Sequence, residues 1–229
     1  MNYKYINGFK IYSFQSITDF INYVKDQNVI LVAMNAEKIM NDNTNLLSIV
    51  NSNIAYPDGE GCVLALKQKG LNSVKLAGSK LWIQLIKLNQ NKKFYLTGST
   101  NFIINKTVDS LKKEFPQLNI VGFRDGFFKD GDKSKLIEDL KLKKPDIIFV
   151  AQGSPRQELL MNELIQHYPA LYMGLGGSFE VYSGYKKDTP KFLHYLKLEW
   201  LYRILIDFKR IKRLPKLLKF IYYLLFKKL

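Results

Sequence analysis

The chain is poor in the residues that build disulfides and zinc sites. Among 229 residues there is one cysteine, Cys62, and there are two histidines, His167 and His194. A single cysteine excludes an internal disulfide and fits a reducing compartment. So few thiol and imidazole groups also leave a zinc site little to draw on. We therefore expect a cytosolic protein that does not depend on a bound metal or other cofactor.

Long apolar runs are also missing. The longest uninterrupted run in the C-terminal part covers residues 220–226, whereas a helix that spans a bilayer needs about 20 apolar residues. Met1 is followed by Asn2, Tyr3 and Lys4 rather than by the apolar core of a signal peptide. We expect neither a secretion signal nor a membrane-spanning segment.

Two common nucleotide-binding motifs are absent as well. The chain has no Walker loop, and the cluster Gly174, Gly176 and Gly177 is not a dinucleotide fingerprint, because the third glycine of that fingerprint would fall at Phe179. This argues against an epimerase or dehydrogenase that carries its own dinucleotide.

Positive charge is abundant and concentrated at one end. Residues 186–229 hold 13 Lys/Arg against 3 Asp/Glu, so +10 of the net charge of +15 lies there. Pro215 must start or kink a helix in this segment. Apolar residues recur at three- and four-residue steps: Ile211, Leu214, Leu218, Ile221, Leu225 and Leu229. Basic residues lie towards the other side: Lys209, Lys212, Arg213, Lys216 and Lys227.

Such a basic amphipathic helix is typical of binding to anionic lipid, which we favour. Two alternatives remain: the apolar stripe packs on the body or on a partner subunit, or the charge binds nucleic acid. No zinc-finger spacing, RNA-binding aromatic motif or helix-turn-helix pattern accompanies the charge.

The body of the chain alternates between short apolar runs and helical stretches. The runs cover residues 93–97, 119–123, 146–151 and 170–174, and helical patterns cover 102–115, 133–142 and 157–167. This alternation predicts an α/β fold, a Rossmann-like and mostly parallel sheet flanked by helices.

The N-terminal part adds further elements to this sheet. Residues 3–6 and 9–12 flank Asn7-Gly8, which predicts a small N-terminal β-hairpin. A buried strand is expected at 28–34, and helices at 36–52, 60–69 and 80–89. We expect an α/β body over residues 1–195 and a helical basic appendage over 196–229.

Glycine-rich loops follow several of the predicted strands. Parallel strands gather ligands at their carboxyl ends, and glycines let backbone amides approach a phosphate. Gly98, Gly176 and Gly177 are therefore candidates for substrate binding.

Two acidic motifs are candidates for chemistry. Asp130-Gly131-Asp132 has the spelling of a divalent-metal motif, but it precedes a predicted helix among lysines, where a turn and an N-cap are expected instead. Pro57-Asp58-Gly59 is a turn that presents a carboxylate, so Asp58 is the better candidate for catalysis.

Six short motifs follow one another along the chain: Asn35-Ala36-Glu37, Pro57-Asp58-Gly59, Ala77-Gly78-Ser79, Gly153-Ser154-Pro155-Arg156-Gln157-Glu158, Gly176-Gly177-Ser178-Phe179-Glu180 and Leu198-Glu199-Trp200-Leu201-Tyr202-Arg203. Together they resemble the WecG/TagA/CpsF family of bacterial glycosyltransferases, family 26, over nearly the whole chain.

The resemblance implies an inverting, metal-independent transfer of a sugar, of the N-acetylmannosamine or uronic acid type, from a UDP donor. The implied acceptor is an undecaprenyl-diphosphate-linked sugar, and the implied location of the enzyme is the inner face of the cell membrane. The product of the transfer would be used in cell-surface polysaccharide or teichoic acid synthesis. The basic appendage agrees with such a peripheral membrane protein. A homo-oligomer is compatible with this picture.

The resemblance also implies roles for particular residues. Asp58 matches the catalytic base, and Asn35 and Gln157 match amides that orient a substrate. Glu158 would brace the Gln157 loop, and Phe127 and Glu180 would contact the uracil nucleoside. The acceptor diphosphate would be bound by three arginines of the appendage, whose planar fork suits phosphate oxygens: Arg203, Arg210 and Arg213.

Three single positions and one triplet depart from the family pattern. Ala33 replaces a threonine, Lys75 an arginine, Lys80 an aspartate, and Asp188-Thr189-Pro190 an Arg-Ala-Pro triplet. Lys75 is still expected to bind substrate. The reaction class is unaffected, but the donor sugar is left unassigned. The alternatives to a transferase are a soluble sugar-nucleotide modifying enzyme and a polyanion-binding module.

Overall fold

The computed structural model of the chain describes residues 1–190, 193, 199–206 and 208–229. Its strands are β1 (Tyr3–Ile6), β2 (Phe9–Tyr12), β3 (Ile30–Met34), β4 (Ile54–Pro57), β5 (Lys93–Gly98), β6 (Asn119–Arg124), β7 (Ile147–Ala151) and β8 (Leu171–Gly174). The body helices are α1 (Ile17–Val24), α2 (Ala36–Ile39), α3 (Thr44–Asn51), α4 (Glu60–Gln68), α5 (Gly78–Leu88), α6 (Asn101–Glu114), α7 (Asp132–Lys143), α8 (Arg156–His167) and α9 (Ser178–Tyr182).

Six of the strands form one parallel sheet in the order β4-β3-β8-β7-β5-β6. The other two pair as the antiparallel hairpin that Asn7-Gly8 predicts. Asn7 and Gly8 both have positive φ, of 47° and 81°, as a two-residue hairpin turn requires. The predicted α/β class, its parallel sheet and its hairpin are confirmed.

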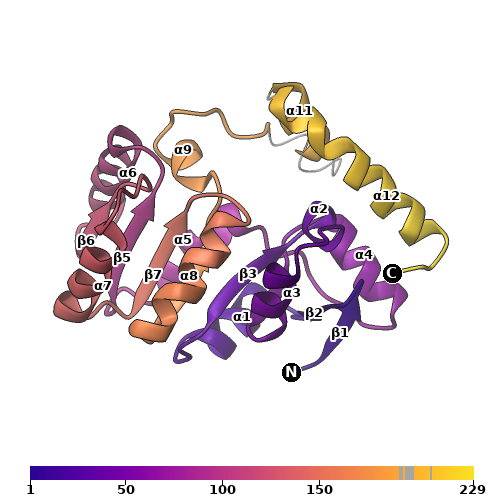
Figure 1. Cartoon of the computed structure of the whole chain (residues 1–229), viewed down its shortest axis with the longest axis horizontal. Helices are drawn as coiled ribbons and strands as arrows, with labels where there is room; N and C mark the ends of the chain where they lie inside the picture. The colour runs from indigo at the N-terminus through magenta and orange to yellow at the C-terminus, as the bar shows by residue number, and fades with distance from the viewer. Residues whose placement is uncertain (191–192, 194–198, 207) are drawn as a thin grey trace.

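Helices cover both faces of the sheet (Figure 1). Side chains alternate along each strand: in β7, Ile147 and Phe149 pack with α1, α5 and α6, whereas Ile148 and Val150 pack with α7 and α8. Both faces of the central strands are therefore buried, which explains why their sequences are apolar throughout.

The sequence analysis missed three elements of the body: β4, α1 and the short helix α9. Strand β4 ends at Pro57 and is only four residues long, so its signal is hidden in the turn motif that follows. Helix α1 is likewise short, although Ser16 caps it by accepting a hydrogen bond from the amide of Asp19 at 2.9 Å. Met34 is fully buried, as expected for a residue that fills the core.

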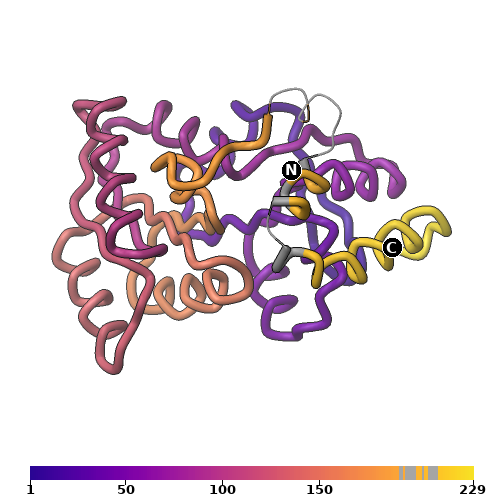
Figure 2. Tube along the Cα trace, turned by 90° about the horizontal axis from the view of Figure 1, so that it is seen from above, coloured from indigo at the N-terminus to yellow at the C-terminus, as the bar shows by residue number. Residues whose placement is uncertain are grey.

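The appendage consists of α11 (Glu199–Ile206), a 3₁₀ turn (Phe208–Arg213) and α12 (Leu214–Leu225). Pro215 stands in the first turn of α12, so it starts this helix rather than kinking it. Figures 1 and 2 both place α12 beside the first third of the chain and away from α6 and α7. The expected boundary at residues 195 and 196 lies outside the described residues.

One face of α12 packs on the body. Phe220 is 2% exposed, and its ring lies so close to Gly61 of α4 that a Cβ there would come within 2.8 Å of Cε1. The Gln68 side-chain amide donates to the Leu224 carbonyl at 2.7 Å. Helix α12 is thus anchored by a tight contact that glycine at position 61 makes possible.

The apolar stripe expected on the appendage lies mostly on the opposite face. Leu218 is 63% and Leu225 72% exposed, and Ile211 and Ile221 are also exposed, whereas Leu229 is buried. The alternative that the stripe packs on the body therefore applies to Leu229 and not to these four residues. None of the described helices is both long enough and apolar enough to span a bilayer.

Candidate active site

The candidate residues gather at the carboxyl edge of the parallel sheet. Asn35 follows β3, Asp58 follows β4, and Gln157 and Glu158 open α8 after β7. Loops at this edge of an open α/β sheet are where ligands bind. The topology thus brings together residues that are more than 100 positions apart.

Asp58 is held by two hydrogen bonds on its own edge of the sheet. Its amide donates to the Met34 carbonyl at 2.9 Å, and its Oδ1 accepts from the Gly78 amide at 2.6 Å. Gly78 begins α5, and the N-terminus of a helix favours a negative charge. The carboxylate is half-buried, and a backbone amide holds one of its oxygens.

Asn35 lies directly beside the Asp58 turn. A Cβ on Gly59 would lie 3.7 Å from the Cβ of Asn35, so the two loops touch. The Asn35 side chain caps α2, because its Oδ1 accepts from the Lys38 amide at 2.9 Å. Its oxygen is therefore used within the chain, which leaves the Nδ2 group as the part that can face a substrate.

A buried network links the loops after β3, β7 and β8. Lys38 Nζ lies 2.7 Å from Glu158 Oε1, and the Gln157 amide nitrogen donates to the same oxygen at 3.2 Å. The Gly176 amide donates to Gln157 Oε1 at 2.8 Å. The network holds the three loops together. Gln157 is buried and forms hydrogen bonds to both Glu158 and Gly176.

The Lys38–Glu158 pair also decides the charge state of Glu158. Burial by itself acts to raise the pKa of this carboxyl, but the charge of Lys38 and its hydrogen bond hold that pKa below its usual value. Glu158 therefore stays ionised at neutral pH although its side chain is buried.

A second part of the site is a cavity of about 460 Å³ at the β5 and β6 end of the sheet. Three largely exposed rings line it, those of Phe102, Phe127 and Tyr185, together with Glu180 and Lys186. Phe127 and Glu180, which the resemblance assigns to the nucleoside, therefore share one cavity. A volume of this size is typical of a small-molecule site.

Ser99 also lines this cavity. Its hydroxyl donates to Glu180 Oε1 at 2.9 Å, and its amide donates to the Ala151 carbonyl at 2.9 Å. Ser99 has a φ of 56°, a left-handed conformation that is uncommon outside glycine. The other carboxylate oxygen of Glu180, Oε2, is buried and has no hydrogen-bond partner.

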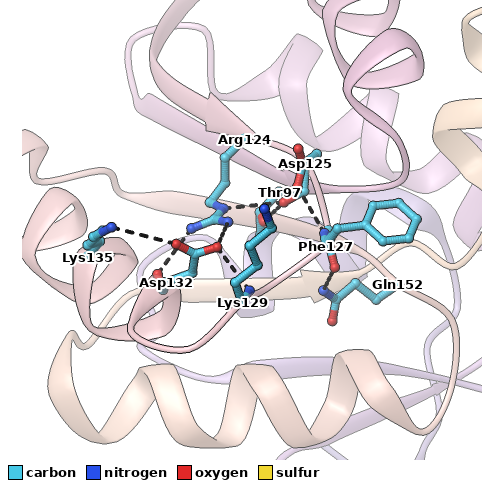
Figure 3. Close-up of polar contacts among 9 residues, drawn as sticks. Thr97, Arg124, Asp125, Phe127, Lys129, Asp132, Lys135 and Gln152 are labelled. Carbon is cyan, nitrogen blue, oxygen red and sulfur yellow. Dashed lines mark hydrogen bonds and ion pairs between the residues drawn. The ribbon is translucent and has the colours of Figure 1, made fainter.

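Phe127 lies on a loop that is held in place by hydrogen bonds, as Figure 3 shows. The Gln152 amide donates to the Gly126 carbonyl at 2.8 Å, and the Phe127 amide donates to Asp125 Oδ1 at 2.9 Å. The ring itself is 68% exposed and points away from these contacts. An exposed ring on a fixed backbone is suited to stacking against a flat ligand.

The three glycine candidates differ in what they do. Gly98 is buried, and a Cβ on it would lie 2.3 Å from the Ala151 oxygen, so it permits the close approach of β5 and β7. The Gly176 amide is already bonded to Gln157. Gly177 is exposed, and a Cβ on it would lie 3.4 Å from Oε2 of Glu180.

The departures from the family pattern fall in different places. Lys75 lies next to the Asp58 turn, with its Nζ 3.9 Å from Glu60 Oε1, and the Leu76 amide bonds the Pro57 carbonyl at 2.8 Å. The Cβ of Ala33 lies 3.9 Å from the position that a Cβ on Gly78 would take. Lys80 and Asp188 are exposed.

The arginines of the appendage are only partly described. Arg213 forms an ion pair with Glu37 at 3.0 Å, which brings α12 to the loop that carries Asn35. The side chains of Arg203 and Arg210 lie outside the described part of the chain. Trp200 is 44% exposed and is not a core residue.

The Asp130-Gly131-Asp132 motif has a structural role, as expected. Gly131 caps α7, and Asp132 accepts from the Lys129 amide at 3.0 Å and pairs with Arg124 at 3.4 Å (Figure 3). The hydrogen bond from Lys129 and the charge of Arg124 lower the pKa of Asp132. Within the described residues, no three His, Cys, Asp or Glu side chains gather as metal ligands would.

Several residues of the site escaped the sequence analysis. Lys38 is a buried lysine, and its only signal is its position three residues after Asn35. Ser99 and Gln152 follow predicted strands but belong to residue types that are common in turns. Tyr56 precedes Asp58 by two residues and looks like an ordinary core aromatic.

A parallel α/β sheet with a half-buried carboxylate and an aromatic-lined cavity at its carboxyl edge is an arrangement that can hold a small-molecule ligand next to a reactive group. Residues 6–229 match the model of the "Glycosyl transferase WecG/TagA/CpsF family". The match spans nearly the whole chain, and the chain therefore belongs to this family of glycosyltransferases, which acts in cell-surface polysaccharide synthesis. Membership confirms the resemblance and decides for a transferase against the two alternatives.

Proposed function

We propose that the chain transfers a sugar from a UDP donor to an undecaprenyl-diphosphate-linked sugar, with inversion and without a metal ion. Asp58 takes the proton of the acceptor hydroxyl while that oxygen forms a bond to the anomeric carbon. The bond from the anomeric carbon to the phosphate oxygen breaks, and UDP leaves as an anion. The observation that carries the proposal is the presence of a fixed carboxylate and an aromatic-lined cavity at the same carboxyl edge of one parallel sheet.

The cavity is suited to the uridine part of the donor. Phe127 offers an exposed face for stacking, and the buried, unpartnered Oε2 of Glu180 can accept the imide N–H of uracil. Lys186 also lines the cavity and supplies a positive charge for the diphosphate. An imide donor distinguishes uracil from cytosine, so Glu180 is proposed to give the site a preference for UDP over CDP.

The acceptor is assigned to the Asp58 end of the site. Asn35 and Lys75 lie beside the Asp58 turn, and the ion pair of Arg213 with Glu37 keeps α12 at the same edge. A phosphate can compete with Glu37 for the Arg213 guanidinium, since both groups present a pair of negatively charged oxygens to its two-pronged donor face. Arg203 and Arg210 are proposed to act with Arg213 on the diphosphate.

The exposed face of the appendage is proposed to rest on the inner membrane surface. Its apolar side chains are Trp200, Leu201, Leu205, Ile211, Leu218, Ile221, Tyr222, Leu225 and Phe226. Exposed apolar side chains interspersed with lysines on a helical segment favour a lipid interface over water. This location places the site next to a lipid-linked acceptor.

The test is a panel of UDP-sugars incubated with a short-chain polyprenyl-diphosphate sugar, with products read by mass spectrometry. N-acetylmannosamine and its uronic acid are the expected donors, and the same sugars linked to GDP serve as controls. One added sugar residue from a UDP donor supports the proposal. No product from any UDP-sugar with the wild-type protein rejects it.

A further inference from the structure

The hydroxyl of Tyr56 is an unusual group in the core. Tyr56 is 0% exposed, lies two residues before Asp58 at the end of β4, and its Oη has no hydrogen-bond partner. Buried polar groups in folded proteins are almost always paired, so an orphan hydroxyl calls for a reason. The ring alone does not supply it, because packing against Phe20, with centroids 5.1 Å apart, would be served equally by phenylalanine.

The geometry around Gly78 shows where this hydroxyl points. A Cβ on Gly78 would lie 3.2 Å from Tyr56 Oη and 3.3 Å from Asp58 Oδ1. The hydroxyl and the carboxylate therefore face the same small space, which is open because residue 78 has no side chain. The Cβ of Ala33 borders this space at 3.9 Å, and Ala33 is itself partly accessible.

The charges nearby keep the hydroxyl protonated. Burial raises the pKa of Tyr56 well above its usual value, and the carboxylates of Asp58 and Glu158 raise it further. Lys38 neutralises Glu158, and the carboxylate of Asp58 accepts a hydrogen bond from the Gly78 amide. Tyr56 is thus a permanent donor beside the candidate base.

We propose that Tyr56 is a positioning residue for Asp58. When the acceptor is bound, the Tyr56 hydroxyl and the Gly78 amide both donate hydrogen bonds to Oδ1 of Asp58. The other carboxylate oxygen, Oδ2, then faces the acceptor hydroxyl. The inference rests on the proposed function, because it needs Asp58 to act as the base. It adds a residue to the site whose contribution lies in orientation of the carboxylate and not in contact with substrate.

The variant Tyr56→Phe tests this role, with Tyr172→Phe as the matched control. Tyr172 is also fully buried on a central strand, but its hydroxyl is satisfied by the Tyr168 carbonyl at 2.7 Å. We expect Tyr56→Phe to keep or raise Tm, since it removes an unpaired buried group, and to lower kcat at least tenfold at unchanged KM for the donor. We expect Tyr172→Phe to lower Tm and to keep kcat.

The split between kcat and KM supplies the readout that a merely structural role would not move. A carboxylate that is no longer oriented by Tyr56 slows removal of the acceptor proton without weakening donor binding. A Tyr56→Phe protein with wild-type kcat overturns the inference, whatever its Tm. If the wild-type protein transfers no sugar from any UDP donor, the proposed function fails and the inference falls with it.

Discussion

The amide of Gly78 donates a 2.6 Å hydrogen bond to Oδ1 of Asp58. This bond connects the end of β4 to the first residue of α5, so the fold itself orients the carboxylate. A positively polarised helix end also favours the ionised form that a general base needs. The relationship makes glycine at position 78 part of the site.

Gly78→Ala is expected to reduce transfer while leaving the protein folded. The new Cβ would stand 3.2–3.3 Å from Tyr56 Oη and Asp58 Oδ1, so both groups must shift by a few tenths of an ångström. Alanine is otherwise favourable in a helix, which limits the loss of stability. We expect kcat to fall at least tenfold and Tm to change little. Unchanged kcat would mean that Asp58 is not held by this contact during the reaction.

Phe127→Ala is expected to weaken UDP binding about tenfold or more, because stacking of a base on an aromatic ring contributes about 1–3 kcal/mol. The ring is 68% exposed, so Tm should stay close to that of the wild type. Isothermal titration with UDP measures the effect. Phe123→Ala, a partly exposed phenylalanine on β6 that does not line the cavity, is the control and should bind UDP normally.

Glu180→Gln tests the recognition of uracil at the same cavity. The buried Oε2 has no partner, and an amide in its place could present a donor where the proposal needs an acceptor. We expect weaker UDP binding and a smaller preference for UDP over CDP. Equal loss of affinity for both nucleotides would argue that Glu180 only supports Ser99.

Lys38→Met is expected to destabilise the fold by about 3–5 kcal/mol, because it leaves the buried charge of Glu158 without its partner. The control is Lys133→Met, which removes an exposed ion pair to Glu163 and should cost at most about 1 kcal/mol. Urea unfolding at pH 7 measures both. Similar losses for the two variants would contradict the buried pair.

The same pair has a predictable pH dependence. The folded-state pKa of Glu158 is lowered, so in the wild type its contribution is present above the unfolded-state pKa of about 4.3 and is lost as the pH falls through the folded-state pKa. In Lys38→Met the lowering by the charge and hydrogen bond of Lys38 is lost, and burial, the largest of the causes, favours the protonated acid. The stability gap between the two proteins should therefore shrink between pH 7 and pH 4.5.

The two faces of α12 should respond differently to substitution. Replacing Leu218, Leu225 and Phe226 by serine changes exposed side chains, so sedimentation with phosphatidylglycerol vesicles should be lost while Tm is kept. Phe220→Ala changes the packed face and should cost about 3–5 kcal/mol of stability. Undiminished vesicle binding by the triple serine variant would show that the exposed face is not the anchor.

Much of the fold was predictable because its signals are local. Apolar runs bounded by turn residues gave β5 to β8, and Asn7-Gly8 gave the hairpin. Strand β4 was not predictable, since four residues ending at Pro57 carry no period of their own. Its place beside β3 depends on packing across the sheet, which the sequence does not display.

The site was predictable where a motif carried it and not where distant contacts did. The sequence motifs predicted Asp58, Phe127 and Glu180 as site residues, and the structure places Phe127 and Glu180 in one cavity. The pairing of Lys38 with Glu158 joins residues 120 positions apart, and no local pattern announces it. The orphan hydroxyl of Tyr56 likewise exists only in three dimensions.

The most direct test of the account is single-turnover transfer by Asp58→Asn compared with the wild type, at saturating UDP-sugar and polyprenyl-diphosphate acceptor. The asparagine side chain can still accept the Gly78 hydrogen bond but cannot take a proton. We predict a rate lower by about 10²–10⁴-fold, with unchanged UDP affinity and unchanged Tm. A rate within a few-fold of the wild type would contradict the assignment of Asp58 as the base.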